Sequence, residues 1–481
     1  MFPRTRQTQY WNIVIIGGVA IYLVISAIYL FIGQANADEG WYLYASKLVW
    51  QGQLPYQDFA YTQTPLLPYI YGLPQTLFGS SLYLGRITSI PFSVITLVVY
   101  LSIAHKHSGK IGAGMTAILL STFTYGIYFM SIVKTYALLA TLFSLVLLAL
   151  ESDYKYKYLI AITLSFLASM TRLSAVAFAI PVVLYCLFAT RNKWLAVALC
   201  LALISVAAFF FLPDIDATRW NLITHHIMQG NPSISARLAE IPSRLLDFAK
   251  QFYVYIILAV TIGFVNRTKV TITPLAIFAV GLALFSASHL ITGGWHIEYF
   301  VPAMMGFLTL IAIVLARVYT TKQFPRQLAL LAILILPASR TASFIDISGG
   351  ALPVEEIREV SEYISANSVA SDKILALEAL WVVVESGRTT PDGMTMAQFS
   401  FVDMDWEEAS QLKLVNGKIV LEYIQNCDAR LVILTDGDWK LFEASGYGEK
   451  IRQALTEHYT LILTRGEFGQ QSNNVYAYTR K

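Results

Sequence analysis

The sequence has little charge and few cysteines for its length. Only 14% of its 481 residues are charged, whereas a soluble domain carries about 25%. The three cysteines (Cys186, Cys200 and Cys427) are scattered, and no Cys-x-x-Cys or Cys/His metal spacing occurs. This excludes a zinc ribbon and a disulfide framework. The part of the chain after residue 343 has no GxGxxG motif and no P-loop, so nothing supports nucleotide binding there, and no nucleic-acid partner is expected.

Apolar residues dominate instead. They make up 56% of the chain, and the mean hydropathy is +0.56. Many lie in runs near the roughly 20 residues that cross a bilayer core, so we expect a mainly α-helical polytopic membrane protein with about eleven spans, in a range of about ten to thirteen. The expected spans are 11–32, 82–104, 111–130, 135–150, 158–170, 174–189, 194–212, 251–265, 271–290, 300–317 and 327–343.

The first apolar run ends in Ala35-Asn36-Ala37, which resembles a signal-peptidase site. The run is longer than the usual apolar region of about 7–15 residues in a signal peptide. We therefore expect a retained first span.

Lysine and arginine are concentrated in alternate loops, which predicts the orientation. The N-terminus and the loops at 105–110, 151–157, 191–193, 266–269 and 321–326 hold them, whereas the long loop 34–80 holds only Lys47. Because basic loops stay on the cytoplasmic side, we expect a cytoplasmic N-terminus in the cytoplasmic (inner) membrane and the 34–80 loop on the outer face. The polar loop 213–250 carries four basic residues, but it is long enough to cross regardless of charge.

The composition changes near residue 343, which divides the chain into a membrane domain (1–343) and a soluble tail (344–481) on the outer face. The tail alternates helical and strand-like patterns, so we expect a small α/β domain with a partly parallel sheet. The predicted helices are 354–364 and 419–425, and the predicted strands are 373–377, 430–436 and 459–465.

The stretch 37–71 contains the main candidate functional residues. It opens with Asp38 and Glu39, directly after the first span, and is rich in tyrosine and tryptophan. Carboxylates at a membrane surface are costly unless they are paired, hydrated or used. They would also serve as helix N-terminal residues, which is the structural alternative.

Three groups of letters in this region carry a family resemblance: D-E-G-W-Y (38–42), P-Y-Q-D (55–58) and P-L-L-P-Y (65–69). This pattern resembles membrane glycosyltransferases of the GT-C class, in particular the branch of protein O-mannosyltransferases and lipid A aminoarabinose transferases. The resemblance covers 1–343 and is most specific over 37–85. It implies a polyprenyl-phosphate-linked sugar as donor, inversion at the anomeric carbon, and an acceptor hydroxyl on a protein, lipid or glycan.

Within that interpretation Asp38 is the candidate general base and Glu39 positions it or the acceptor, because direct displacement needs a carboxylate to take the acceptor proton. Cationic side chains would stabilise the departing phosphate. The candidate substrate-binding residues are Lys134, Arg172, His296, Tyr299, Asp58 and Tyr61.

The sequence also departs from the family pattern. Gln63 and Thr64 replace a Glu-Lys pair that holds metal and phosphate in the aminoarabinose branch, so a metal site like theirs is not expected. A divalent cation at His296 and Glu298 stays open as a weak alternative. We expect His225-His226 to be part of loop structure and His289 to be a hydrogen-bonded interior histidine.

Two alternative functions remain. A transporter or flippase of lipid-linked sugars would also bury charge and admit lipid, but it would place its site near the membrane midplane. A polymerase or ligase of surface polysaccharide would use a different donor.

Overall fold

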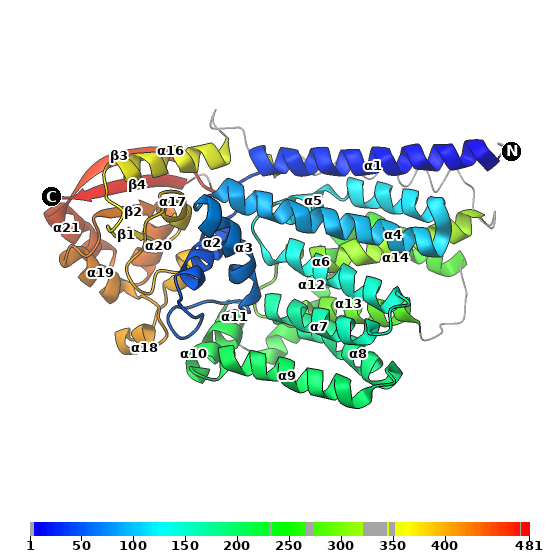
Figure 1. Ribbon diagram of the computed structural model, residues 1–481. Helices are drawn as coiled ribbons and strands as arrows, with labels where there is room; N and C mark the ends of the chain where they lie inside the picture. The colour runs from blue at the N-terminus through cyan, green and yellow to red at the C-terminus, as the bar shows by residue number, and fades with distance from the viewer. Residues whose placement is uncertain (1–3, 230–232, 266–272, 321–343, 346–351, 472) are drawn as a thin grey trace.

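A computed structural model describes residues 4–229, 233–265, 273–320, 344–345, 352–471 and 473–481. The chain is mainly helical. Figure 1 shows a bundle of helices with a smaller α/β domain at one end, and the N-terminus lies at the opposite end of the bundle. The first helix, α1 (Arg4–Ile32), runs from that far end toward the α/β domain.

Four of the described helices are long and apolar enough to cross a membrane. They are α1, α4 (Leu82–Thr122), α9 (Lys193–Phe211) and α14 (Val301–Thr320), the last counted with the 3₁₀ turn η2 (Ile297–Phe300). A fifth span arises if α5 (Thr124–Ser131) and α6 (Thr135–Glu151), bent by 106° at their junction, are taken together. The chain is therefore an integral membrane protein, as expected.

Three shorter apolar helices are also described: α7 (Lys157–Thr171), α8 (Ala175–Ala189) and α13 (Pro274–Leu290). The expected span 327–343 lies outside the described residues. The count of about eleven spans stays a prediction.

One expected break is present and one expected loop is not. Non-helical backbone at Ser108 and Gly109, where Gly109 takes a φ of +62°, kinks α4 between the expected spans 82–104 and 111–130. The chain turns back there, because Ser93 before the kink contacts Tyr22 of α1 and Gly114 after it lies against Trp11. The region 213–250 is not an irregular loop. It holds α10 (Ile215–Arg219), the π-helical turn η1 (Trp220–Thr224), α11 (His225–Met228) and the first half of α12 (Ile234–Val265). Apolar residues recur at helical spacing from Ile234, which explains the long helix.

The 34–80 loop contains two short helices, α2 (Ala37–Trp50) and α3 (Leu66–Phe78). Asn36 begins α2 with a capping box, in which its side chain bonds the backbone of the first turn and Glu39 bonds back to the backbone of Asn36. The signal-peptidase-like letters are thus part of a helix start.

The tail has a four-stranded sheet in the order β1-β2-β4-β3. β1 (Ile374–Ala376) pairs in parallel with β2 (Leu431–Thr435), and β4 (Asn473–Arg480) pairs antiparallel with β2 and with β3 (Tyr459–Phe468). The partly parallel sheet is confirmed, and β4 is an additional strand. The helices of the tail are α16 (Pro353–Ala366), α17 (Leu380–Glu385), η4 (Ala397–Ser400), α18 (Trp406–Gln411), α19 (Gly417–Gln425), α20 (Asp436–Ala444) and α21 (Gly448–His458).

The tail is docked on α2 by buried contacts. Trp381 donates from its indole nitrogen to the Asn36 carbonyl at 2.9 Å, and the Thr390 backbone N–H donates to the Tyr44 hydroxyl at 2.9 Å. A Cβ added at Gly40 would lie 2.8 Å from the Trp381 backbone nitrogen, so only glycine permits this close approach. The tail thereby covers the end of the bundle where the candidate residues lie.

Candidate active site

Asp38 lies in the first turn of α2, where the helix dipole favours a carboxylate. Its Oδ1 accepts a hydrogen bond from Trp41 Nε1 at 3.1 Å, and its Oδ2 lies 3.0 Å from Lys134 Nζ. Burial alone would raise the pKa of Asp38, but the Lys134 ammonium and these hydrogen bonds hold it below its ordinary value. The side chain keeps 25% of its surface exposed, so an ionised and accessible carboxylate stands here.

Lys134 lies at the break between α5 and α6 and is almost fully buried. Besides Asp38, its Nζ lies 3.5 Å from Glu298 Oε1. One ammonium thus lies between two carboxylates from distant parts of the chain. Lys134 therefore holds Asp38 ionised, and its contact with a donor phosphate stays a prediction.

Arg172 lies at the turn between α7 and α8 and is 7% exposed. Its guanidinium stacks over the Tyr299 ring at 4.3 Å, and its Nη1 donates to Thr135 Oγ1 at 3.3 Å. Among the described residues no carboxylate lies within 4.0 Å of it. Because a buried charge without a counter-ion is costly, this guanidinium is suited to a bound anion, which an arginine holds bidentately.

These side chains share one cavity of about 260 Å³, called here the Asp38 cavity. The membrane domain lines it with Asn36, Ala37, Asp38, Trp41, Tyr42, Thr62, Gln63, Lys134, Tyr136, Arg172, His226, Gln229, His296, Glu298 and Tyr299. The tail adds Gln398, Phe399, Gln470 and Gln471. Six of the residues predicted from sequence are thus brought together: Asp38, Lys134, Arg172, His296, Tyr299 and the weak metal candidate Glu298.

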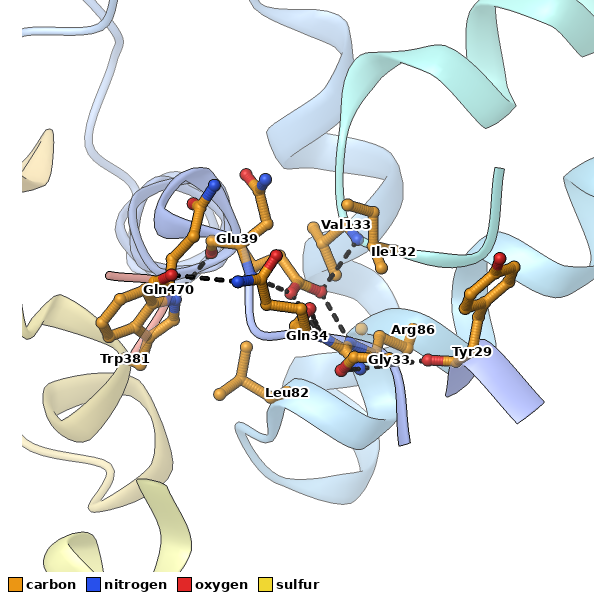
Figure 2. A network of polar contacts seen from close by, with 12 residues as sticks. Tyr29, Gly33, Gln34, Glu39, Leu82, Arg86, Ile132, Val133, Trp381 and Gln470 are labelled. Carbon is orange, nitrogen blue, oxygen red and sulfur yellow. Dashed lines mark hydrogen bonds and ion pairs between the residues drawn. The ribbon is translucent and has the colours of Figure 1, made fainter. Parts of the chain in front are cut away.

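Glu39 is buried beneath this cavity and does not line it. Its carboxylate forms a fully buried ion pair with Arg86, with Oε2–Nη2 at 2.6 Å and Oε1–Nε at 2.9 Å (Figure 2). Oε1 also accepts the Val133 backbone N–H at 3.1 Å, next to Lys134. Arg86 donates in addition to the carbonyls of Tyr29, Leu30, Gly33 and Gln34. The pair ties α1, α2, α4 and the Lys134 break together.

Asp58 and Tyr61 lie away from the Asp38 cavity. Asp58 accepts the Leu54 backbone N–H at 2.7 Å and faces a separate cavity between the loop and the tail. Tyr61 is fully buried and packs against Trp41 with ring centroids 5.6 Å apart. The geometry gives these two residues structural surroundings, with no access to a substrate in the Asp38 cavity.

A divalent cation at His296 and Glu298 stays a prediction. His296 Nδ1 lies 3.9 Å from Glu298 Oε1. Lys134 Nζ occupies the position between Asp38 and Glu298 that a cation would need. Within the described residues, no three His, Cys, Asp or Glu side chains are placed to hold a metal ion.

Some cavity residues were not anticipated from the sequence. His226 Nε2 lies 2.8 Å from the Thr62 carbonyl and faces the cavity, while the adjacent His225 bonds Gln229 Nε2 at 2.8 Å instead. The only available signal was that two polar aromatic residues interrupt an apolar segment. For Gln398, Phe399, Gln470 and Gln471 the sequence offered none, because the folding of the tail alone brings them here.

The described architecture is a bundle of apolar helices that carries a small α/β domain over a polar cavity. Two solved structures have a similar fold: ArnT from Cupriavidus metallidurans bound to undecaprenyl phosphate (TM-score 0.62) and the same protein in the apo state (TM-score 0.63). Each is 13% identical, and the match covers 96% of this chain and 97% of ArnT. The chain therefore has the ArnT fold, in agreement with the resemblance to the GT-C class.

A weaker likeness, with a TM-score of 0.46 and 11% identity, is to an oligosaccharyltransferase from Archaeoglobus fulgidus in complex with zinc and sulfate. It covers 96% of this chain and 73% of that one. No protein-family profile matches the chain, and no curated protein matches it by sequence.

Proposed function

We propose that this protein is a glycosyltransferase that moves a sugar from a polyprenyl-phosphate donor to an acceptor hydroxyl. One observation carries the proposal: a partly exposed carboxylate (Asp38), paired with Lys134, and a buried guanidinium (Arg172) without a carboxylate partner among the described residues line the same cavity. Such a cavity offers a proton acceptor and an anion site together. The ArnT fold supports this assignment, and one of the ArnT structures holds undecaprenyl phosphate.

The donor phosphate is assigned to Arg172. Its planar guanidinium matches two phosphate oxygens, and the rings of Tyr299 and Tyr136, at 4.3 and 5.6 Å, hold it in place. The isoprenoid chain of the donor would then extend between the membrane helices, where only lipid-like groups are soluble.

The reaction is a single displacement. The acceptor hydroxyl oxygen attacks the anomeric carbon, Asp38 takes the hydroxyl proton, and the bond from the anomeric carbon to the phosphate oxygen breaks with its electron pair leaving on the phosphate. Arg172 stabilises the charge that develops on the leaving phosphate. Lys134 keeps Asp38 ionised before the proton is transferred. Direct attack inverts the anomeric configuration.

We assign the acceptor to the part of the Asp38 cavity that the tail lines. Gln398, Gln470 and Gln471 supply neutral amide donors and acceptors there, and Phe399 supplies an aromatic surface. This lining suits a hydroxyl-bearing protein, lipid or glycan. We place the tail and the cavity on the outer face of the cytoplasmic membrane, as the alternating basic loops predict.

The test is turnover by purified protein with a polyprenyl-phosphate sugar and envelope acceptors. Asp38→Asn is nearly isosteric and keeps the site packed, but it cannot accept a proton, so the rate should fall about 10²–10⁴-fold. Asp153→Asn, in an exposed loop far along the chain, is the matched control and should be fully active.

Near-normal turnover by Asp38→Asn would remove Asp38 from the mechanism. Movement of intact lipid-linked sugar across vesicles, with no transfer to any acceptor, would favour the transporter alternative.

A further inference from the structure

A second cavity adjoins the Asp38 cavity and contains a buried histidine without a hydrogen-bond partner. It is called here the His289 cavity. Its volume is about 190 Å³, and six of its lining residues also line the Asp38 cavity: Thr62, Gln63, Arg172, His226, Gln229 and Tyr299. The two cavities therefore adjoin, with Arg172 and Tyr299 at their boundary.

His289 lies near the end of α13 and is 2% exposed. Within the described part of the chain, neither Nδ1 nor Nε2 has a hydrogen-bond partner. The expectation of a hydrogen-bonded interior histidine is thus wrong. The ring is held by Phe285 at 4.8 Å and Tyr299 at 5.0 Å, which fix its orientation without using either nitrogen.

Ser174, which also lines the His289 cavity, carries a second buried polar atom of this kind. It stands at the start of α8, yet its hydroxyl does not cap the helix and has no partner among the described residues. Buried polar atoms of native proteins are almost always hydrogen-bonded. A polar residue in a membrane domain that faces a cavity also points to a ligand. Two such groups in one small cavity indicate a ligand that itself carries several hydroxyl groups.

We infer that the His289 cavity binds the sugar ring of the donor. The volume equals that of roughly six water molecules at liquid density, which suits one sugar ring. Sugar hydroxyls would satisfy His289 and Ser174, whereas an isoprenoid would leave both without partners. Leu173 and Leu222 supply an apolar wall for a ring face. Because Arg172 borders both cavities, the sugar and its phosphate can be bound side by side.

This inference rests on the proposed function, and binding measurements separate the two. The probes are undecaprenyl phosphate alone and undecaprenyl phosphate linked to each of a set of common hexoses and pentoses. For wild-type protein, at least one glycoside should bind more tightly than the bare lipid phosphate. His289→Phe keeps a ring among Phe285 and Tyr299 but removes both nitrogens, so it should abolish this preference, a loss of about tenfold, and leave binding of the bare lipid phosphate unchanged.

His289→Asn, which keeps a donor and an acceptor, should retain part of the preference. Ser174→Ala, a minimal change in the same wall, should reduce it in the same direction and serves if His289→Phe does not fold. The thermal midpoint of ligand-free His289→Phe should be unchanged or higher, because an apolar ring replaces buried polar atoms that have no partner. A structural role for His289 predicts the opposite.

An unchanged preference in both His289→Phe and Ser174→Ala overturns the sugar site while the proposed function stands. Equal binding of every glycoside and the bare lipid phosphate by wild-type protein overturns it too. If wild-type protein does not bind even the bare lipid phosphate, the proposed function fails, and the sugar site fails with it.

Discussion

At the scale of single residues, the site depends on two adjacent carboxylates with opposite surroundings. Asp38 is accessible and paired with Lys134, whereas Glu39 is enclosed and paired with Arg86. Successive residues of a helix point in directions about 100° apart, so the first turn of α2 sends one side chain into the cavity and the other into the core. The sequence motif alone could not distinguish these roles.

Lys134 should control the pH at which Asp38 works. With Lys134 present the pKa of Asp38 is lowered, so Asp38 stays ionised until the pH falls below the ordinary aspartate range. In Lys134→Met the burial remains and the opposing cation is gone, so this pKa should rise. The acid limb of kcat/KM, which reports the free enzyme, should then move to higher pH.

Trp41→Phe removes only one neutral hydrogen bond to Asp38 and should move the acid limb less, in the same direction. An acid limb that stays in place in Lys134→Met would mean that another group sets the profile.

The Glu39–Arg86 pair should matter for stability more than for chemistry. Removing one partner of a buried ion pair leaves an uncompensated charge and costs about 3–5 kcal/mol. Glu39→Ala should therefore lower the thermal midpoint sharply. The double variant Glu39→Ala with Arg86→Met should recover much of the loss, because neither charge is then buried alone. A double variant as unstable as the single one would contradict this account.

At the scale of elements, apolar periodicity was a good guide inside the tail and a poor one around 213–250. The predicted helices 354–364 and 419–425 correspond to α16 and α19 within a few residues. β4 (N-N-V-Y-A-Y-T-R) was missed because only Val475 and Ala477 are buried, which is too short an alternation to indicate a strand. It becomes a strand through pairing with β2 and β3, which is tertiary information.

The junction of β2 and α20 should make the tail sensitive to pH. Burial raises the pKa of Asp438 to about 7, and the Glu378 carboxylate adds to this effect, although backbone N–H groups of Glu378 and Thr435 oppose it. The folded state therefore holds the Asp438 proton more tightly than the unfolded chain does. This stabilisation is complete below the ordinary value of about 3.9 and is lost as the pH rises through about 7.

The thermal midpoint reported by tail tryptophan fluorescence should accordingly fall between about pH 5 and pH 8. Glu378→Gln keeps the shape of its partner and removes its charge, so the Asp438 pKa should drop and the fall should become shallower. An equally steep fall in Glu378→Gln would show that other groups cause it.

At the scale of the whole molecule, the candidate site lies at the interface between the helical bundle and the tail. The bundle supplies the charged residues, which short motifs in the sequence indicated. The tail closes the cavity with neutral side chains from η4 and from the β3–β4 turn. Contacts between residues several hundred positions apart, such as Trp381 with Asn36, form this interface. No local sequence pattern predicts the interface, because the bundle and the tail must both fold before they come into contact.

The orientation of the whole molecule is the final prediction. Lys155 lies just after α6, a 17-residue helix that begins beside Lys134, so it is about 25 Å from the cavity along the helix. Glu449 lies on the tail, and its side chain is 96% exposed. In a variant whose three cysteines are replaced by serine, Glu449→Cys should react with a membrane-impermeant maleimide on intact cells. Lys155→Cys should react only after permeabilisation. Labelling of Lys155→Cys alone on intact cells would invert the topology and place the cavity on the cytoplasmic side, where the basic loops predict it should not be.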